Sequence, residues 1–271
     1  MIREMRIRNY SPRSINTYVS VISHLAQHFN TSPEQLTVDQ VKDYLHYKIK
    51  NRSCSVSLVN QTISALKILF QDVLGMKWEN IKIKRPRKEK KLPVILSRQE
   101  VDAVISQIRN PKHKAMLAVV YSAGLRRHEL VSLKVSDIDS ARMFIRVNQG
   151  KGKKDRETLL AENTLKLLRQ YYILYKPSGL LFEGRPKGTP ISFTSVSNIL
   201  KKALNKAGIN KKASIHSLRH SFATHLLEQG TNIKIIQRLL GHHSIRTTMV
   251  YLQLAQIDPT AVRSPFDNLN F

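Results

Sequence analysis

The chain has 271 residues, of which 45 are Lys or Arg and 19 are Asp or Glu, so its formal net charge is +26. Such an excess repels itself unless a polyanion neutralises it, which favours nucleic acid as partner over an anionic membrane or an acidic protein. A hydrophobic content of 41% excludes wholesale disorder. The uncharged, strongly apolar stretch of residues 115–125 is too short for a membrane helix, and the single cysteine, Cys54, excludes an intrachain disulfide. We therefore expect a cytoplasmic protein that binds a polyanion rather than a membrane.

The first 80 residues have the apolar spacing of helices. Ser11 followed by Pro12 predicts a helix start, and Thr37 with Gln40 predicts a capping box ahead of a second helix. Apolar residues at helical spacing between Val56 and Phe70 mark a third helix. We expect a small all-helical domain over residues 1–80, with its Tyr and Leu stripes in the core.

Residues 81–95 interrupt this pattern with a run of basic residues between two prolines. Like charges and prolines both oppose helix formation, so the segment is predicted to be an extended linker. It is either a solvated loop or a strap along a phosphate backbone. In the second case the DNA contacts would come from Lys84, Arg85, Arg87 and Lys88, and Lys153, further along the chain, is predicted to contact DNA as well.

The remainder, residues 96–271, is predicted to be helical with one β-hairpin and a C-terminal tail. Ser97 with Glu100 predicts a capping box, and Gly124 separates two helical stretches. Residues 143–147 and 156–160 alternate as strands around a basic tip that contains Lys151 and Lys153. Helical patterns resume over residues 164–175, 194–207, 216–229, 233–240 and 244–254. The expected fold is mainly α with a small antiparallel sheet.

The residues that could do chemistry are cations, histidines and one tyrosine. His216 and Arg219 share one helix face, while Arg126 and His242 each follow closely on a helix-breaking glycine. Such a set suits negative charge developing on a phosphate. Without a metal, the clamped phosphate needs a protein nucleophile, and Tyr251 is a candidate.

Competing site types have less support. A metal nuclease needs clustered carboxylates, but Asp137 and Asp139 lie in a predicted turn and are interpreted as structural. A zinc site lacks cysteines and a His-Glu-x-x-His arrangement, and a serine hydrolase lacks Gly-x-Ser-x-Gly around Ser217 and Ser221. His220 and His225 are interpreted as satisfied buried histidines. We predict neither a metal nor a cofactor.

At this point the sequence resembles the tyrosine recombinase (phage integrase) family and is most similar in size and layout to its Xer-type members. The motifs that carry the resemblance are Gly124-Leu125-Arg126 with Glu129-Leu130, Gly150-Lys151-Gly152, His216-x-x-Arg219-His220, Leu240-Gly241-His242 and Thr247-Thr248-x-x-Tyr251. More loosely, residues 10–18 resemble the opening of the family's SAM-like core-binding domain. The resemblance implies an α+β catalytic domain that closes with the helical domain as a C-shaped clamp on DNA.

The resemblance also implies a role for each motif residue. Tyr251 would attack the scissile phosphate, giving a 3′-phosphotyrosyl link and a free 5′-hydroxyl, while Arg126 and Arg219 hold the non-bridging oxygens. Lys151, favoured over Lys153, would protonate the leaving oxygen. His216 would assist proton transfer at the tyrosine, and His242 would hydrogen-bond the phosphate.

The family's behaviour implies double-stranded DNA with a specific core site, a homotetramer that exchanges C-terminal tails, and a Holliday junction. Residues 262–269 resemble the endings of transposon-borne integrases, which favours integration or excision of a mobile element, with Xer-type resolution as the next interpretation. Two rival activities remain: a type IB topoisomerase-like enzyme and a non-catalytic DNA-binding protein on the same scaffold.

Overall fold

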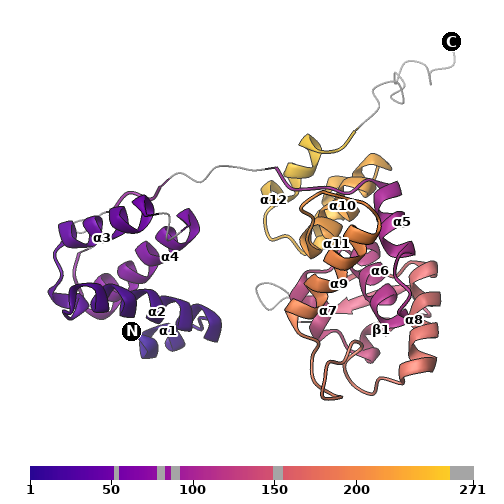
Figure 1. The fold of residues 1–271 in the computed structure, drawn as a ribbon, viewed down its shortest axis with the longest axis horizontal. Coiled ribbons are helices and arrows are strands. Elements are labelled where there is room, and N and C mark those ends of the chain that lie inside the picture. Colours follow the sequence, from indigo (N-terminus) through magenta and orange to yellow (C-terminus); the bar gives the residue numbers. More distant parts are fainter. Residues whose placement is uncertain (52–54, 78–82, 87–91, 149–154, 257–271) are drawn as a thin grey trace, which may run out of the picture. The chain divides into compact units, whose positions relative to one another are not determined.

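The computed structural model describes residues 1–51, 55–77, 83–86, 92–148 and 155–256. The chain divides into two compact units, Met1–Lys91 and Leu92–Phe271 (Figure 1). Within the linker, the structure describes Lys84 and Arg85 but not Arg87 and Lys88. Within the tail, it describes residues 255 and 256 but not residues 257–271. None of the described helices is both long and apolar enough to cross a membrane.

The N-terminal unit is helical, as predicted. Its elements are α1 (Ile2–Ile7), α2 (Pro12–Phe29), η1 (Pro33–Gln35), α3 (Val38–Lys50), α4 (Val56–Lys67) and η2 (Ile68–Val73). The hydroxyl of Ser11 accepts a hydrogen bond from the backbone N–H of Ser14 at 3.1 Å, which confirms the predicted start of α2. The capping box of Thr37 and Gln40 is also present. α4 continues directly into a π-helical turn, η2, so the helical stretch predicted between Val56 and Phe70 ends at Val73.

Buried side chains of α2, α3 and α4 form the core of this unit, among them Leu25, Val41 and Leu66. The described part of the basic segment is attached to it. Arg85 donates hydrogen bonds to the carbonyl of Asn60 at 3.1 Å and to the hydroxyl of Ser64 at 2.9 Å. Arg85 is therefore held against α4.

The second unit combines helices with a three-stranded antiparallel sheet in the order β1-β2-β3. Its helices are α5 (Arg98–Ser106), α6 (Pro111–Ala123), α7 (Arg127–Ser132), η4 (Val135–Asp137), α8 (Glu162–Tyr175), α9 (Phe193–Lys206), α10 (Ile215–Glu228), α11 (Ile233–Leu240), α12 (Ile245–Met249) and η5 (Val250–Gln253). The strands are β1 (Ile138–Asp139), β2 (Phe144–Val147) and β3 (Arg156–Leu159). In the register, Ile138 pairs with Ile145 and Arg146 pairs with Glu157.

The core of this unit surrounds α6. Residues 115–120 of α6 are all buried, because α8 packs on one side of this helix and α10 on another. A helix that is apolar on every side belongs in the interior. The nearly uncharged stretch of the sequence is therefore a core helix.

The structure of this unit differs from the prediction at one strand and one helix. The two-residue strand β1 was not predicted, because so short a segment shows no periodicity. The predicted helix 244–254 is instead the short α12 followed by the 3₁₀ turn η5, which carries Tyr251. Thr247, Thr248 and Val250 are β-branched, which lowers the preference for continuing an α-helix.

Candidate active site

Two glycines in the left-handed conformation shape the backbone of the site. Gly124 (φ +60°) ends α6 and Gly241 (φ +61°) ends α11. A Cβ on Gly124 would lie 2.4 Å from the ring of Phe222, and one on Gly241 would lie 2.6 Å from Cδ of Arg156. Both turns therefore require glycine, for conformation and for space.

These turns bring four predicted catalytic residues together: Arg126, Arg219, His242 and Tyr251. Arg126 donates from Nη2 to the carbonyl of Gly241 at 3.1 Å. Arg219 donates from Nη2 to the carbonyl of Leu240 at 2.6 Å and lies 3.1 Å from Nε2 of His242. The ring of His242 stacks on that of Tyr251, with centroids 6.4 Å apart and planes 11° apart. Segments far apart in the sequence thus converge on the end of α11.

Glu129 is a buried carboxylate that organises the arginines and that our site prediction missed. Its Oε1 lies 2.8 Å from Nη1 of Arg126 and 2.7 Å from Nη1 of Arg156, and its Oε2 lies 3.8 Å from Nη1 of Arg219. Arginine hydrogen bonds, together with the backbone N–H of Arg126, outweigh burial and lower the pKa of Glu129 to about 2. The signal for this role was its place three residues after Arg126, on the first turn of α7.

Arg156 is the second missed residue, and it connects β3 to the site. Its two terminal nitrogens bind both oxygens of Glu129 at 2.7 and 2.8 Å, and its Nε donates to the carbonyl of Leu239 at 2.8 Å. The side chain is only 7% exposed. Since β3 is one leg of the hairpin, Arg156 fixes the base of the hairpin to α7 and α11.

The contacts of His242 assign its proton. Arginine can only donate, so Nε2 of His242 accepts from Arg219 and its Nδ1–H donates to the hydroxyl of Thr248 at 2.9 Å. Burial, with Arg219 and Arg126 nearby, lowers the pKa of His242 to about 3. The imidazole is therefore neutral at pH 7.

Tyr251 is 1% exposed and its hydroxyl lies 3.0 Å from Nδ1 of His220. Burial raises the pKa of the Tyr251 phenol, although Arg219 and Arg126 oppose the rise. His216, predicted to serve the tyrosine, is exposed and is not among the hydrogen-bond partners of Tyr251 in the described part of the chain. Burial and Arg219 nevertheless lower the pKa of His216. His220 was interpreted as a satisfied histidine, and the hydrogen bond with Tyr251 is the contact that satisfies it.

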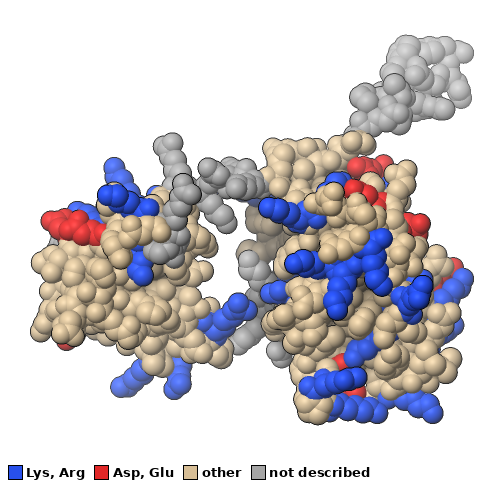
Figure 2. Space-filling model, in the orientation of Figure 1, with Lys and Arg blue, Asp and Glu red and all other residues tan. Residues whose placement is uncertain are grey.

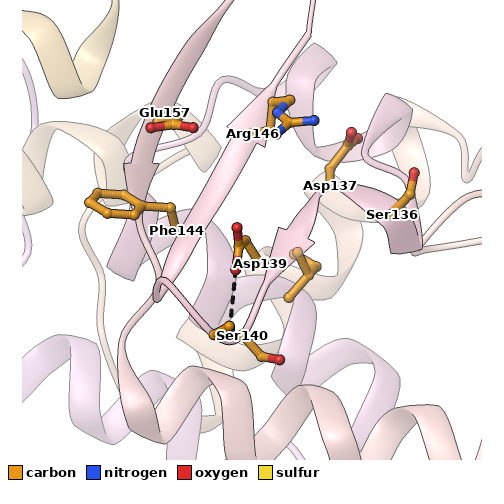
Figure 3. Close-up of a pocket in the computed structure, with 9 residues that line it drawn as sticks. Ser136, Asp137, Asp139, Ser140, Phe144, Arg146 and Glu157 are labelled. Atoms are coloured by element: carbon orange, nitrogen blue, oxygen red, sulfur yellow. Dashed lines mark hydrogen bonds between the residues drawn. The ribbon is translucent and has the colours of Figure 1, made fainter.

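The two hairpin lysines, Lys151 and Lys153, lie outside the described residues. The outer face of the sheet holds a small pocket that contains the carboxylates interpreted as structural (Figure 3). Asp139 accepts from the backbone N–H groups of Ala141 and Arg142, and Asp137 accepts from the backbone of Lys134. Both carboxylates therefore stabilise turns, as predicted. The described residues contain no group of three or more His, Cys, Asp or Glu placed to hold a metal ion.

Basic side chains form several groups on the visible face of the second unit. Figure 2 shows Lys and Arg gathered over the region where α7, α9 and α11 lie, with few acidic groups among them. Arg127, beside Arg126, lies over the ring of Phe193 at 4.7 Å from the centroid. The site is thus set in a positively charged surface, which attracts a phosphate backbone.

Comparisons with known proteins agree with this geometry. The model of the phage integrase family matches residues 94–257, and that of the phage integrase N-terminal SAM-like domain matches residues 1–80. A putative integrase/recombinase, y4qK of Sinorhizobium fredii, is 38% identical over 270 residues, covering 99% of this chain and 88% of that protein. Tyrosine recombinase XerA of Pyrococcus horikoshii is 35% identical over 245 residues, covering 89% and 84%.

Solved structures share the fold. XerH recombinase bound to its difH substrate before cleavage gives a TM-score of 0.73 at 22% identity, covering 93% of this chain and 78% of that one. A lambda integrase dimer bound to a core site gives 0.75 at 18% identity, covering 92% of each chain. The chain therefore belongs to the phage integrase family and is a tyrosine-type site-specific DNA recombinase.

Proposed function

We propose that this recombinase cuts one DNA strand by attack of Tyr251 Oη on the scissile phosphate. The attack forms a 3′-phosphotyrosyl link and releases a 5′-hydroxyl, which can later attack the phosphotyrosine and restore a phosphodiester. The observation that carries the proposal is the convergence of Arg126, Arg219, His242 and Tyr251 at the end of α11. Because the link retains the energy of the phosphodiester, rejoining needs no ATP.

The two arginines would stabilise the charge that builds on the non-bridging oxygens. Arg126 is 19% exposed and Arg219 is 3% exposed, so Arg126 is the more accessible to an incoming phosphate. Guanidinium groups bind phosphate oxygens bidentately, and removing one such donor costs about 10²- to 10³-fold in rate. To hydrogen-bond the phosphate, as the family resemblance implies, His242 must carry a proton on Nε2, the nitrogen that accepts from Arg219 in the free protein.

Two further residues complete the chemistry in this proposal. Lys151 protonates the leaving 5′-oxygen, a role that the family resemblance assigns to this hairpin position rather than to Lys153. His216 is exposed one helical turn before Arg219, where a DNA phosphate can reach it. With DNA bound, His216 assists proton transfer at Tyr251, the role that the family resemblance assigns to it.

We further propose that four protomers join two duplexes and exchange strands in pairs through a Holliday junction. Each protomer closes its two domains around the DNA, with Lys84 and the other linker cations along the backbone, and passes its tail to a neighbour. XerH and lambda integrase, which share the fold, were solved on DNA, and the lambda integrase structure is a dimer. The transposon-like ending of the sequence favours integration or excision of a mobile element.

Recombination between two copies of the target site tests this function. The site is mapped first on DNA that flanks the gene, by covalent trapping with the wild-type protein. A plasmid carrying two such sites is then expected to give recombinants and Holliday junctions, while Tyr251→Phe gives neither. Relaxation of supercoils without strand exchange would contradict the proposal and favour a topoisomerase-like activity.

A further inference from the structure

We infer that Asn148 is a positioning residue, which holds one leg of the hairpin so that Lys151 can protonate the leaving 5′-oxygen. The inference rests on the proposed role of Lys151 as the general acid. Lys151 lies outside the described residues, three positions beyond Asn148 along the chain. Asn148 itself is described, and its side chain makes a contact that the proposed function does not use.

The contact joins Asn148 to a buried carboxylate. Its amide Nδ2 donates to Oδ1 of Asp137 at 2.6 Å, and Asp137 is 7% exposed. An ionised carboxylate can only accept, so the amide nitrogen faces Asp137 and the hydrogen bond is charge-assisted. The other oxygen, Oδ2, accepts from the backbone N–H of Lys134 at 2.9 Å. Within the described residues, the amide of Asn148 is therefore the side-chain partner of this carboxylate.

Asp137 belongs to a segment whose backbone is fixed to the rest of the second unit. Val135, two residues earlier, donates from its N–H to the carbonyl of Gly179 at 3.0 Å. On the other side, β1 begins directly after Asp137 and pairs with β2. Asn148 is therefore tied to the frame of this domain rather than to another loop.

Asn148 lies where the paired strands of the hairpin end. The last pair of the register joins Val147 of β2 to Arg156 of β3. Asn148 is the next residue after that pair and is exposed, so its side chain contributes nothing to the core. On the opposite leg, Arg156 binds both oxygens of Glu129. Both legs are thus held by a carboxylate at the point where the strands end and the tip begins.

Such a hold matters for a proton donor on the tip. In the proposed reaction the P–O5′ bond breaks with its electron pair on O5′, and the ammonium group of Lys151 supplies the proton. A positioned acid contributes about 10²- to 10⁴-fold in rate, and a displacement of about 1 Å can cost about 10²-fold. Only residues 149 and 150 lie between Asn148 and Lys151. Loss of the hydrogen bond moves the last fixed point of this leg back to Val147, so the lysine reaches O5′ less often.

The test compares two leaving groups in single-turnover cleavage of the mapped site. A 5′-bridging phosphorothiolate leaves as a thiolate and needs no proton, so it bypasses any residue that acts through the acid. We expect Asn148→Ala to form the covalent adduct about 10- to 10²-fold more slowly than the wild type on ordinary DNA. On the phosphorothiolate its rate should equal that of the wild type.

A second variant and a double variant sharpen the test. Asn148→Asp keeps the size of the side chain but places a carboxylate against that of Asp137, so attraction becomes repulsion. It should cleave ordinary DNA more slowly than Asn148→Ala and should also recover on the phosphorothiolate. In the Lys151→Ala background, Asn148→Ala should add no further loss, because the residue through which it acts is already gone.

Asp139 supplies a matched control at the opposite end of the same sheet. Its Oδ1 accepts from the backbone N–H groups of Ala141 and Arg142 at 3.1 and 2.8 Å, in the turn between β1 and β2 (Figure 3). Asp139→Ala removes a comparable polar contact from the sheet without touching the contacts of Asn148. It should cleave ordinary DNA at close to the wild-type rate.

Four results would overturn the inference. They are a wild-type rate of Asn148→Ala on ordinary DNA, an equal loss on both leaving groups, a further loss in the Lys151→Ala background, and the same leaving-group dependence in Asp139→Ala. An equal loss on both leaving groups would mean that Asn148 supports the fold rather than the acid. The same dependence in Asp139→Ala would mean that any weakening of the sheet has this effect.

Failure of the proposed function gives a different result. If the wild type forms no adduct that depends on Tyr251, or if Lys151→Ala shows no recovery on the phosphorothiolate, the proposed chemistry falls and the inference falls with it. If Lys151→Ala is slow on ordinary DNA and recovers while Asn148→Ala does not behave in the same way, only the inference falls.

Discussion

Replacing Glu129 with glutamine removes the one carboxylate that pairs with Arg126, Arg156 and Arg219 in the described part of the chain, while keeping the size of the side chain. Glu129 is 4% exposed and lies within 3.8 Å of Arg126, Arg156 and Arg219. Its pKa falls from 4.5 to about 2, which corresponds to about 3 kcal/mol of extra stability for the ionised side chain. Removing one partner of a buried ion pair costs about 3–5 kcal/mol, a similar magnitude. We therefore expect Glu129→Gln to destabilise the second unit by about 3 kcal/mol.

The same shift predicts a pH dependence. A carboxyl whose pKa is lower in the folded state than in the unfolded state stabilises the fold fully when the pH is above its unfolded-state pKa. This contribution is lost as the pH falls through its folded-state pKa. The wild type and Glu129→Gln should therefore differ by a constant free energy of unfolding above about pH 5. The difference should shrink as the pH falls from 4.5 towards about 2.

Hydrogen-exchange mass spectrometry over α10 measures this effect on the second unit alone. A loss of about 3 kcal/mol predicts roughly 10²-fold faster exchange of the most protected amides at neutral pH. Glu157→Gln is the matched control, because that carboxylate is 41% exposed and pairs with Arg142 at 3.4 Å. An exposed pair contributes about 0–1 kcal/mol. Equal effects of the two substitutions would refute the proposed organising role of Glu129.

Four other predictions follow from the site and its surroundings. Gly241→Ala should lower the melting temperature more than Gly208→Ala, because both need positive φ but only Gly241 abuts Arg156; equal shifts in calorimetry would count against this. Lys151→Ala should cleave slowly on ordinary DNA and recover on a 5′-bridging phosphorothiolate, whose thiolate leaves without a proton, whereas Lys153→Ala should need no such rescue. Lys84→Ala should reduce the slope of log affinity for DNA against log salt concentration by about one unit, without changing the stability of the N-terminal unit. Arg85→Ala should also destabilise that unit, because it removes hydrogen bonds to α4. Deleting residues 258–271 should leave binding to a single site intact in gel-shift titrations but weaken the paired complex.

The local structure was the most predictable part of the fold. The caps at Ser11, Thr37 and Ser97 were confirmed because side-chain capping depends on residues only three positions apart. The turns at Gly124 and Gly241 were predicted for the same reason. In contrast, the 3₁₀ turn that carries Tyr251 was predicted as part of one helix, because the burial of Tyr251 in a cluster with residues of α10 and α11 is a tertiary feature.

The candidate site was predictable in its motif residues but not in their supporting contacts. Arg126, Arg219, His242 and Tyr251 were identified together through spacing and family resemblance, and the structure brings them to the end of α11. The role of Arg156 was not predicted, because the alternation of apolar and polar residues around it indicates a strand but not the contact with Glu129. The contact between His220 and Tyr251 was not predicted, because the two residues lie far apart in the sequence and only tertiary packing brings them together.

The most direct test of the account is covalent trapping on nicked suicide DNA in the presence of EDTA, with the wild type beside Tyr251→Phe. The account predicts a 3′-linked protein–DNA adduct that forms with the wild type, survives denaturation, and is absent with phenylalanine at position 251. An adduct that persists in Tyr251→Phe, or one attached to a 5′ end, would contradict it.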